Sequence, residues 1–514
     1  MSFASNLMIS TAAGPTAEFA NLGDLLRAAV VKDPAKVAVV QPAQPSDTHI
    51  TYGDLDRQTT ALAQRLLQIA KPGDRVAVHW TNAIEVVELF FACFKAGLIA
   101  VPVNVRMKAP EIRYVLEHSK SVLCFSQPEL SPLANEAARD VVSIHRVYTS
   151  VADFEKNTDV PSGSLPEVNL DHHALILYTS GTTARPKGVT HTHRSLLNSA
   201  RLMVDVAPGS FNTVLVLTQM MHTSGINCDL LPSIYSAGTA VLVPAFDAAL
   251  VLNLIERYEC SFSMGLPSLV QFLLEEQTRQ PRKVSSLKTF VAGGDSVPVA
   301  MQERFQALFG ITLREGFGMT ESLPSIFNPA DRIRPGSLGK PVAGVEVRVI
   351  ADDGSEARRN EKGEIVVRSS ANCVGYWDDP ASTVETLRGG WLHTGDLGRI
   401  DADGYLWFEG RKKEIIIRGG SNISPQEVEE ALYSHPAVLE AAVIGMPDGA
   451  YGEKVLAFVS LRAGLAAEEA ELREHARARL ADYKVPEAVH FLDVLPKGIT
   501  GKLQRRVLKE MAKG

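Results

Sequence analysis

Hydroxyl-bearing, glycine and lysine residues follow one apolar run in a pattern that suits phosphate. The strand-like run Ala174–Leu177 continues as Tyr-Thr-Ser-Gly-Thr-Thr-Ala-Arg-Pro-Lys-Gly, residues 178–188. Backbone N–H groups of such a segment can converge on an anion, the hydroxyls add donors, and Lys187 adds positive charge. The P-loop of nucleoside triphosphatases needs Gly-Lys-Ser/Thr, whereas this segment ends in Arg-Pro-Lys-Gly. Taken alone, it could equally be a polar surface loop.

Five later segments supply the other residue types that phosphoryl and acyl transfer need. Between them they contain two histidines, two carboxylates, an arginine and several lysines. In chain order they are Met221–Gly225, Gly316–Glu321, Trp391–Asp396, Gly410–Lys413 and Pro496–Lys502. Each one alone has an ordinary structural explanation, such as a core histidine, a surface glutamate or a turn aspartate. Their occurrence together and in this order makes the pattern specific.

With the phosphate segment, this ordered set resembles the superfamily of adenylate-forming enzymes, which includes acyl-CoA synthetases, peptide-synthetase adenylation domains and luciferases. The resemblance runs from about residue 22 to residue 508 and is closest to the stand-alone acyl-CoA ligases. It implies an acid–thiol ligase that works in two steps. A carboxylate first attacks the α-phosphate of ATP, which gives an acyl-adenylate and pyrophosphate. A thiol then takes the acyl group and releases AMP, so ATP, Mg²⁺ and CoA are the implied cofactors.

The resemblance also implies roles around the nucleotide. The phosphate segment would hold the β- and γ-phosphates, and Glu321 would help to hold Mg²⁺, an ion that prefers oxygen ligands. Phe317 matches a ring that stacks on adenine, while Asp396 and Arg411 match the residues that grip the ribose hydroxyls. The implied cofactor contacts are Thr179, Ser180, Gly181, Thr182, Thr183, Lys187, Glu315, Gly316, Phe317, Thr320, Asp396, Arg411, Lys413, Gly419 and Gly420.

On the acid side, His222 matches a histidine that lies between ATP and the acyl pocket in the family. With Lys502 and Glu321, it completes the implied catalytic set. The implied substrate contacts are Ser224, Gly225, Gly293, Gly294 and Gly318. Because no cation clearly awaits a second carboxylate, we expect a fatty or aryl monocarboxylic acid as the substrate.

The C-terminal lysine is implied to act in only one of the two steps. Lys502 would reach the α-phosphate and the substrate carboxylate during adenylation, a role that suits a long, flexible cation. In the family, the small C-terminal domain then rotates about a hinge that Lys413 matches. Gly419-Gly420 would replace Lys502 and line the pantetheine tunnel, where glycine lets the backbone approach a ligand closely.

Three positions depart from the family pattern. Ala184 stands where glycine is common, Phe317 where tyrosine is frequent, and Gln219 where proline often precedes the histidine segment. None of these departures removes a catalytic group. Their expected effect is on the rate and on the dynamics of the phosphate loop.

Composition narrows the class of protein. A chain of 514 residues exceeds one compact domain, and a net charge of -7 gives no case for nucleic acid or an anionic membrane as partner. The most apolar stretch, Val86–Val103, contains Glu88 and Lys95, so it predicts a buried helix entering a strand and not a membrane span. Scattered cysteines, and no charged signal-peptide start before Arg27, predict a reduced, cytoplasmic protein.

The elements that must position these residues alternate along the chain. Helix-period runs such as Leu55–Ile69 and short apolar strands such as Val76–His79 predict an α/β fold with largely parallel sheets. Two layered α/β subdomains are expected, then a β-rich subdomain from Gly336 to Glu409 and a small mobile α+β domain. We predict an N-terminal AMP-binding (adenylation) domain at residues 1–412 and a mobile C-terminal domain carrying Lys502 at residues 413–514.

Other interpretations differ in the acceptor or in the class of protein. An enzyme that loads a carrier-protein phosphopantetheine would differ only in its thiol, and the lack of a fused carrier domain after Gly514 favours free CoA. A non-catalytic nucleotide-binding relative would have no reason to retain Lys187, Glu321 and Lys502. His191-Thr192-His193 lacks further ligands at metal-site spacing and is predicted to begin a helix. A monomer and a homodimer both fit the sequence.

Overall fold

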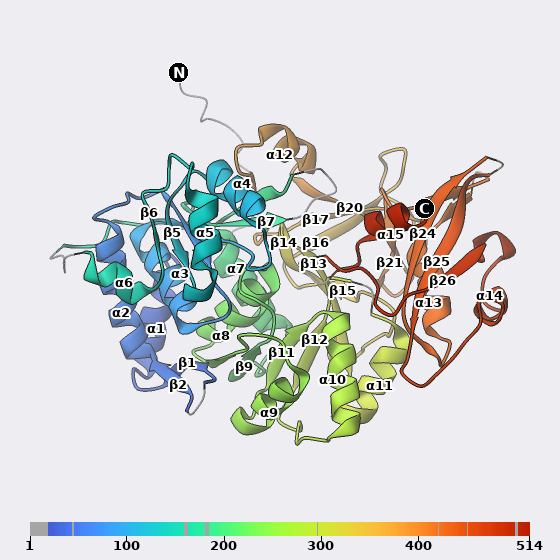
Figure 1. Ribbon diagram of the computed structural model, residues 1–514, viewed down its shortest axis with the longest axis horizontal. Helices are drawn as coiled ribbons and strands as arrows, with labels where there is room; N and C mark the ends of the chain where they lie inside the picture. Colours follow the sequence, from blue (N-terminus) through green and yellow to red (C-terminus); the bar gives the residue numbers. More distant parts are fainter. Residues whose placement is uncertain are drawn as a thin grey trace.

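The alternating pattern folds into two α/β bodies, a β-rich subdomain and a smaller C-terminal domain, which forms the orange and red end of the molecule (Figure 1). The structure is a computed structural model that describes residues 19–43, 46–158, 163–179, 185–295, 297–419, 421–449, 451–498 and 502–513. The predicted fold class is confirmed.

The first α/β body is built on a sheet of seven strands among the described residues. These are β3 (Arg75–His79), β4 (Ile99–Pro102), β5 (Ser121–Ser126), β6 (Arg146–Tyr148), β7 (His173–Thr179), β8 (Lys187–Thr192) and β18 (Gly375–Tyr376). Their order is β18-β8-β7-β4-β3-β5-β6. The strands from β7 to β6 pair in parallel, as expected for buried apolar strands joined through helices, whereas β8 and β18 run antiparallel to their neighbours.

The second body carries a sheet of nine strands within the described ranges. These are β1 (Val37–Gln41), β2 (Thr48–Thr51), β9 (Thr213–Val216), β10 (Thr239–Leu242), β11 (Phe262–Gly265), β12 (Thr289–Ala292), β13 (Leu313–Met319), β14 (Ser322–Phe327) and β15 (Lys340–Pro341). Their order is β15-β14-β13-β12-β11-β9-β10-β1-β2. The six strands from β13 to β1 pair in parallel, so the carboxyl ends of β12 and β13 meet at one edge.

Helices cover the faces of both sheets (Figure 1). They are α1 (Gly23–Lys32), α2 (Tyr52–Leu66), α3 (Ile84–Ala96), α4 (Ala109–Ser119), α5 (Ser131–Ala138), α6 (Val151–Lys156), α7 (His193–Val206), α8 (Leu231–Tyr235), α9 (Ala248–Tyr258), α10 (Pro267–Arg279) and α11 (Val299–Phe309), with a 3-10 turn η1 (Pro128–Leu130) and a π-helix η2 (Ser224–Leu230). Helix α3 packs against β1 of one sheet and β3 and β4 of the other, which explains why it is buried on all sides. The predicted buried helix entering a strand is confirmed.

The β-rich subdomain forms an antiparallel sheet and sends one excursion back to the first body. Its strands are β16 (Glu346–Ile350), β17 (Gly363–Arg368), β19 (Leu387–Arg388), β20 (Trp391–Ile400) and β21 (Leu406–Arg411), with helix α12 (Pro380–Thr386) before β19. The order is β16-β17-β20-β19, and β21 pairs with β20. Between β17 and β19 the chain leaves this sheet so that β18 can pair with β8.

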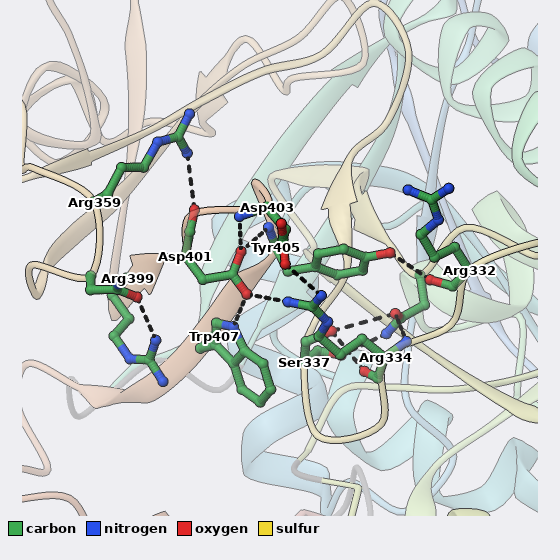
Figure 2. Close-up of polar contacts among 11 residues, drawn as sticks. Arg332, Arg334, Ser337, Arg359, Arg399, Asp401, Asp403, Tyr405 and Trp407 are labelled. Carbon is green, nitrogen blue, oxygen red and sulfur yellow. Dashed lines mark hydrogen bonds and ion pairs between the residues drawn. The ribbon is translucent and has the colours of Figure 1, made fainter.

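Figure 2 shows how the turn between β20 and β21 is held to the segment that follows β14. The Asp401 carboxylate accepts from Arg334 Nη1 at 2.6 Å and from Trp407 Nε1 at 2.9 Å. Arg334 also pairs with Asp403 at 2.7 Å, and its guanidinium lies 4.3 Å from the Tyr405 ring centroid. This network fixes the distal end of the β20–β21 hairpin to the segment between β14 and β15.

The C-terminal domain has its own apolar core. Its elements are β22 (Ile416–Arg418), β23 (Ser421–Ile423), α13 (Pro425–Tyr433), β24 (Val438–Asp448), β25 (Gly452–Leu461), α14 (Glu469–Arg477), η3 (Asp482–Lys484), β26 (Ala488–Phe491) and α15 (Arg505–Met511). Within the described chain, the two apolar clusters of this domain contain residues from Ile416 onward and none from earlier.

Two predicted features can be compared directly with the described residues. All five cysteines are buried and unpaired, as expected for reduced thiols. In the described part of the chain, no helix combines the length and the apolarity that crossing a membrane would require.

Candidate active site

The two described ends of the predicted phosphate segment belong to the antiparallel strands β7 and β8. Thr179 pairs with Lys187 and Tyr178 pairs with Gly188. The strand-like run predicted over Ala174–Leu177 continues to Thr179, and Lys187 and Gly188 already belong to β8. Ser180, Gly181, Thr182 and Thr183, together with Ala184, lie outside the described residues.

Helix α4 contacts both arms of this hairpin. The Tyr114 hydroxyl donates to the Pro186 carbonyl at 2.9 Å, and its ring centroid lies 5.7 Å from the Arg185 guanidinium. One turn later, His118 Nδ1 lies 2.8 Å from the Tyr178 hydroxyl. Residues four apart share a helix face, so the two side chains hold the two arms from one side. Sequence reasoning missed them, although this spacing is a signal that could have found them.

Lys187 projects toward the excursion that carries β18 and α12. Its Nζ donates to Ser382 Oγ at 2.7 Å and lies 4.9 Å from the centroid of the Tyr376 ring. Ser382 lies in the first turn of α12, where its N–H donates to the capping carboxylate of Asp379. A neutral hydroxyl and an aromatic face therefore hold the predicted phosphate lysine. Neither Tyr376 nor Ser382 was identified from the sequence.

Glu321 lies in the turn between β13 and β14, where only 7% of it is exposed. The Tyr376 hydroxyl donates to its Oε1 at 2.7 Å, and the Cys373 N–H donates to its carbonyl at 2.7 Å. Burial raises the pKa of the carboxyl, and the Tyr376 hydrogen bond and the charges of Lys502 and Lys187 oppose that rise. The structure thus brings the predicted metal-side carboxylate close to both predicted lysines.

The His191–His193 segment is structural. Thr192 caps α7 by accepting from the Ser195 N–H, so the predicted helix start is confirmed. His191 Nε2 donates to the Thr320 carbonyl at 2.8 Å, and burial lowers the pKa of this imidazole to about 4. No group of three or more histidine, cysteine or acidic side chains suited to a metal occurs among the described residues. His191 instead fixes the backbone next to Glu321.

Asp396 and Arg411 are register partners across β20 and β21. Arg411 Nε lies 3.4 Å from Asp396 Oδ1. Burial raises the pKa of Asp396 to about 6, against the opposing charges of Arg411 and Lys502. The hairpin thereby presents one acceptor and one forked donor side by side, which suits a pair of hydroxyl groups.

Lys502 extends from the C-terminal domain toward the N-terminal one. Its Cε lies 3.7 Å from the position that a Cβ on Gly294 would occupy. Its side chain still reaches water, but desolvation between the domains lowers its pKa, and the charge of Arg411 adds to that effect. The carboxylates of Asp396 and Glu321 favour its charged form. The structure therefore brings together charged residues from both domains that the sequence predicted for one site.

The residues predicted to contact adenine lie on β13, whereas His222 precedes the π-helix η2. Gly316 and Phe317 belong to β13, and Glu315 of the same strand is buried beside Gln302, with a pKa that burial raises to about 8. Burial, with the charges of Lys502 and Arg106, lowers the pKa of His222 to about 4, so its imidazole is neutral at neutral pH. Arg106 was not identified from the sequence.

Gln219 replaces the proline of the family pattern with hydrogen bonds. Its Oε1 accepts from the Asn82 N–H at 3.1 Å, and its Nε2 donates to the Pro244 carbonyl at 3.0 Å. The Asn82 side chain in turn accepts from the Met220 N–H at 2.8 Å. Side chains therefore hold the segment before His222, where a proline would restrict its backbone.

Several glycines predicted for the acid pocket have close backbone packing. The predicted set is Ser224, Gly225, Gly293, Gly294 and Gly318. A Cβ on Gly225 would lie 2.6 Å from the Gln219 carbonyl oxygen, and one on Gly318 would clash with the Leu323 side chain. Gly294 has a φ of +85°, a conformation that other residues rarely adopt. Their contact with an acid stays a prediction.

Lys413, the predicted hinge residue, and Gly419, predicted for the tunnel, lie on the C-terminal side of the site. Lys413 is in an exposed turn after β21. Gly419 has a φ of +57° in the turn after β22, and its N–H donates to the Tyr451 carbonyl at 2.7 Å. Gly420 lies outside the described residues. In this arrangement Lys502 reaches Gly294 of the N-terminal domain, whereas a Cβ on Gly419 would meet Tyr451 of the C-terminal domain.

Known proteins resemble this chain over most of its length. The AMP-binding enzyme family matches residues 26–377, and the AMP-binding enzyme C-terminal domain matches residues 427–502. A feruloyl-CoA synthase of Amycolatopsis is 36% identical over 89% of this chain and 92% of its own. A long-chain-fatty-acid–CoA ligase of Bacillus subtilis is 34% identical over 85% of both. A solved anthranilate CoA ligase in complex with anthranoyl-AMP has a TM-score of 0.90 at 29% identity, over 96% of this chain and 98% of that chain.

The chain therefore belongs to the AMP-binding enzyme family. It is an AMP-forming acid–CoA ligase, and the predicted resemblance and class of enzyme are confirmed.

The raised pKa of Asp396 leads to a prediction for adenosine binding. Asp396 is predicted to accept from both ribose hydroxyls, which only its ionised carboxylate can do, so affinity should be full above about pH 7 and fall as the pH drops through about 6. One pH unit below that pKa, we expect a loss of about tenfold. Calorimetry with adenosine, which carries no phosphate to titrate, would measure this profile. Asp396→Asn should bind weakly at every pH, and a variant that keeps the original profile would refute the assignment.

Proposed function

We propose that the protein activates a fatty or aryl monocarboxylic acid with ATP, through an acyl-adenylate, and transfers the acyl group to CoA with release of AMP and pyrophosphate. One observation carries the proposal. Lys502, Glu321 and Asp396 come from separate segments and two domains, yet each lies in the electrostatic field of the others. Phosphoryl transfer depends mainly on such positioning and charge neutralisation.

In the first step, a carboxylate oxygen of the acid attacks the α-phosphorus, and the bond to the oxygen of the departing pyrophosphate breaks. Lys502 would donate to the α-phosphate and to the attacking carboxylate, while Lys187 would turn from Ser382 to the β- and γ-phosphates. The neutral imidazole of His222 can donate a hydrogen bond there without repelling Lys502.

The residues present fit a magnesium ion. Mg²⁺ is commonly bound through one or two carboxylates plus substrate phosphates and water, so a cluster of acidic side chains is unnecessary. Glu321 offers a buried carboxylate beside Lys187 and Lys502. When bound, the ion would supply charge neutralisation to the triphosphate.

In the second step, the thiol attacks the acyl carbonyl carbon and AMP leaves with the bridging oxygen. We propose that the domain from residue 413 rotates about Lys413, which withdraws Lys502 and brings Gly419-Gly420 to the thiol. Its separate apolar core supports movement as one body. A direct contact that would have to break is the one from the Val299 N–H to the Glu430 carboxylate, at 3.2 Å.

For the acid, the proposal names a chemical class and not a single compound. Ferulate and long-chain fatty acids in the names of two relatives support a monocarboxylate, although a sulfoacetate–CoA ligase of Cupriavidus necator is also 33% identical. CoA is the acceptor of this class of ligase, and transfer to a carrier-protein phosphopantetheine is the alternative to be tested. We propose a cytoplasmic protein that acts as a monomer or homodimer.

A panel of acids tests this function. Purified protein would receive ATP, Mg²⁺, CoA and one acid at a time: fatty acids of graded length, cinnamic and benzoic acids, and short dicarboxylic or sulfonated acids. We expect acid-dependent pyrophosphate release and acyl-CoA for monocarboxylates. Activity only with the doubly charged acids would overturn the substrate class, and acyl transfer only to a carrier protein would overturn the acceptor.

A further inference from the structure

Tyr376 contacts both charged groups that the proposed function brings to the metal–triphosphate. Its hydroxyl donates to Glu321 Oε1 at 2.7 Å, and its ring centroid lies 4.9 Å from Lys187 Nζ. Glu321 follows β13 of one sheet, whereas Lys187 begins β8 of the other. One side chain therefore spans the junction between the two α/β bodies.

The backbone around Tyr376 is held on both sides. Tyr376 pairs with Val189 across β18 and β8, and the next N–H, of Trp377, donates to the Gly188 carbonyl at 2.7 Å. The Tyr376 N–H donates to Thr383 Oγ1 of α12 at 2.9 Å. Such a fixed backbone gives the aromatic ring a defined position relative to the hairpin that carries Lys187.

We propose that Tyr376 is a positioning residue for the metal-bound nucleotide, with its hydroxyl orienting the Glu321 carboxylate and its ring holding the Lys187 ammonium. The proposal rests on the function proposed above. With Oε1 held by Tyr376, the second oxygen of Glu321 is the one we assign to the metal. Lys187 contacts the neutral hydroxyl of Ser382 and the ring of Tyr376, and neither contact is an ion pair. It can therefore leave Ser382 for a phosphate without breaking an ion pair at either contact.

The expected loss of Mg²⁺ affinity can be estimated from other metal sites, where residues hydrogen-bonded to the metal ligands have been removed. A hydrogen bond that orients a metal-binding side chain typically accounts for 10- to 100-fold in metal affinity. Loss of the hydroxyl alone should leave the ring beneath Lys187. Tyr376→Phe should therefore reduce the contribution of Mg²⁺ to ATP binding by about tenfold. Tyr376→Leu, which also removes the ring, should in addition weaken ATP binding without metal.

The experiment compares ATP affinity by calorimetry with and without Mg²⁺, in the absence of acid and CoA so that nothing turns over. AMP without metal reports on the ribose and adenine contacts and should bind equally to all variants. Tyr148→Phe is the matched control: Tyr148 is 5% exposed and lies on β6, at the opposite edge of the same sheet. Thermal melting would verify that each variant is folded.

A double-mutant cycle with Glu321→Gln separates positioning from general packing. If Tyr376 acts through Glu321, Tyr376→Phe should have no further effect on the gain from Mg²⁺ in the Glu321→Gln background. Additive losses, or an unchanged gain in Tyr376→Phe alone, would overturn the proposal while leaving the ligase function intact. Absence of any ATP binding by the unmodified protein would instead refute the proposed function. If Tyr376→Phe fails to fold, Tyr376→His serves in its place, because histidine retains a ring and a hydrogen-bond donor. This variant should keep the gain in ATP affinity from Mg²⁺. Loss of that gain would also count against the proposal.

Discussion

Lys502→Ala is expected to slow the adenylation half-reaction by about 10²–10³-fold and to leave thioester formation from supplied acyl-adenylate and CoA nearly unchanged. The reason is that Lys502 lies within the field of Asp396 and Glu321 in this arrangement, at the place where the proposed mechanism develops charge on the α-phosphate. Removal of one preorganised donor to a transition state has a cost of that size. The two rates would be measured separately, as acid-dependent pyrophosphate release and as acyl-CoA formed from synthetic adenylate.

Lys497→Ala provides the control for this prediction. Lys497 belongs to the same C-terminal segment, but its Nζ pairs with Glu440 at 2.6 Å within the C-terminal domain. Its removal should change neither half-reaction appreciably. Equal losses in both halves for Lys502→Ala would contradict a lysine that serves only the first step.

Lys413→Pro should lower overall acyl-CoA formation by about 10²-fold, since misplacement of a reacting group by an ångström can reduce a rate by that much. The adenylation and thioester half-reactions should be affected unequally. Lys413 is the third residue of a turn in which the Glu414 N–H donates to the Arg411 carbonyl at 2.8 Å. Proline is disfavoured there because it restricts the preceding residue. The arrangement that presents Lys502 should thus be disfavoured, and adenylation should fall more than thioester formation.

Lys412→Ala is the matched substitution at the neighbouring exposed position. It keeps the backbone hydrogen bond from the residue 412 N–H to the Gly395 carbonyl at 3.0 Å and leaves the dihedral freedom of Lys413 unchanged. The adenylation and thioester half-reactions should both retain their rates in this variant. A Lys413→Pro protein with normal rates in each half and overall would show that rotation does not depend on this backbone position.

Local pattern predicts the buried elements well. The predicted strand Val76–His79 differs from β3 by one residue, because strands buried on both faces read as continuous apolar runs. The pairing of Thr179 with Lys187 escaped prediction because the hairpin tip between them is long and polar. Antiparallel pairing across such a tip leaves little local signal.

The motif residues were predicted from the ordered set of segments, whereas the residues that contact them in the fold were not. Asp396 and Arg411 are recognisable in their segments, but their register across β20 and β21 is a property of the folded hairpin. Tyr376 acquires its contacts with Glu321 and Lys187 only because an excursion from the β-rich subdomain returns to β8. No periodicity or local spacing connects residues so far apart in the chain.

Isotope transfer tests the central claim most directly. The acid would be labelled with ¹⁸O in its carboxylate and supplied with ATP, Mg²⁺ and CoA, and the nucleotide product would be analysed by mass spectrometry. Attack on the α-phosphorus followed by thiol attack on the acyl carbon leaves one labelled oxygen in AMP, and this is the result we predict. Unlabelled nucleotide with ¹⁸O in inorganic phosphate, and ADP as the second product, would contradict an acyl-adenylate intermediate.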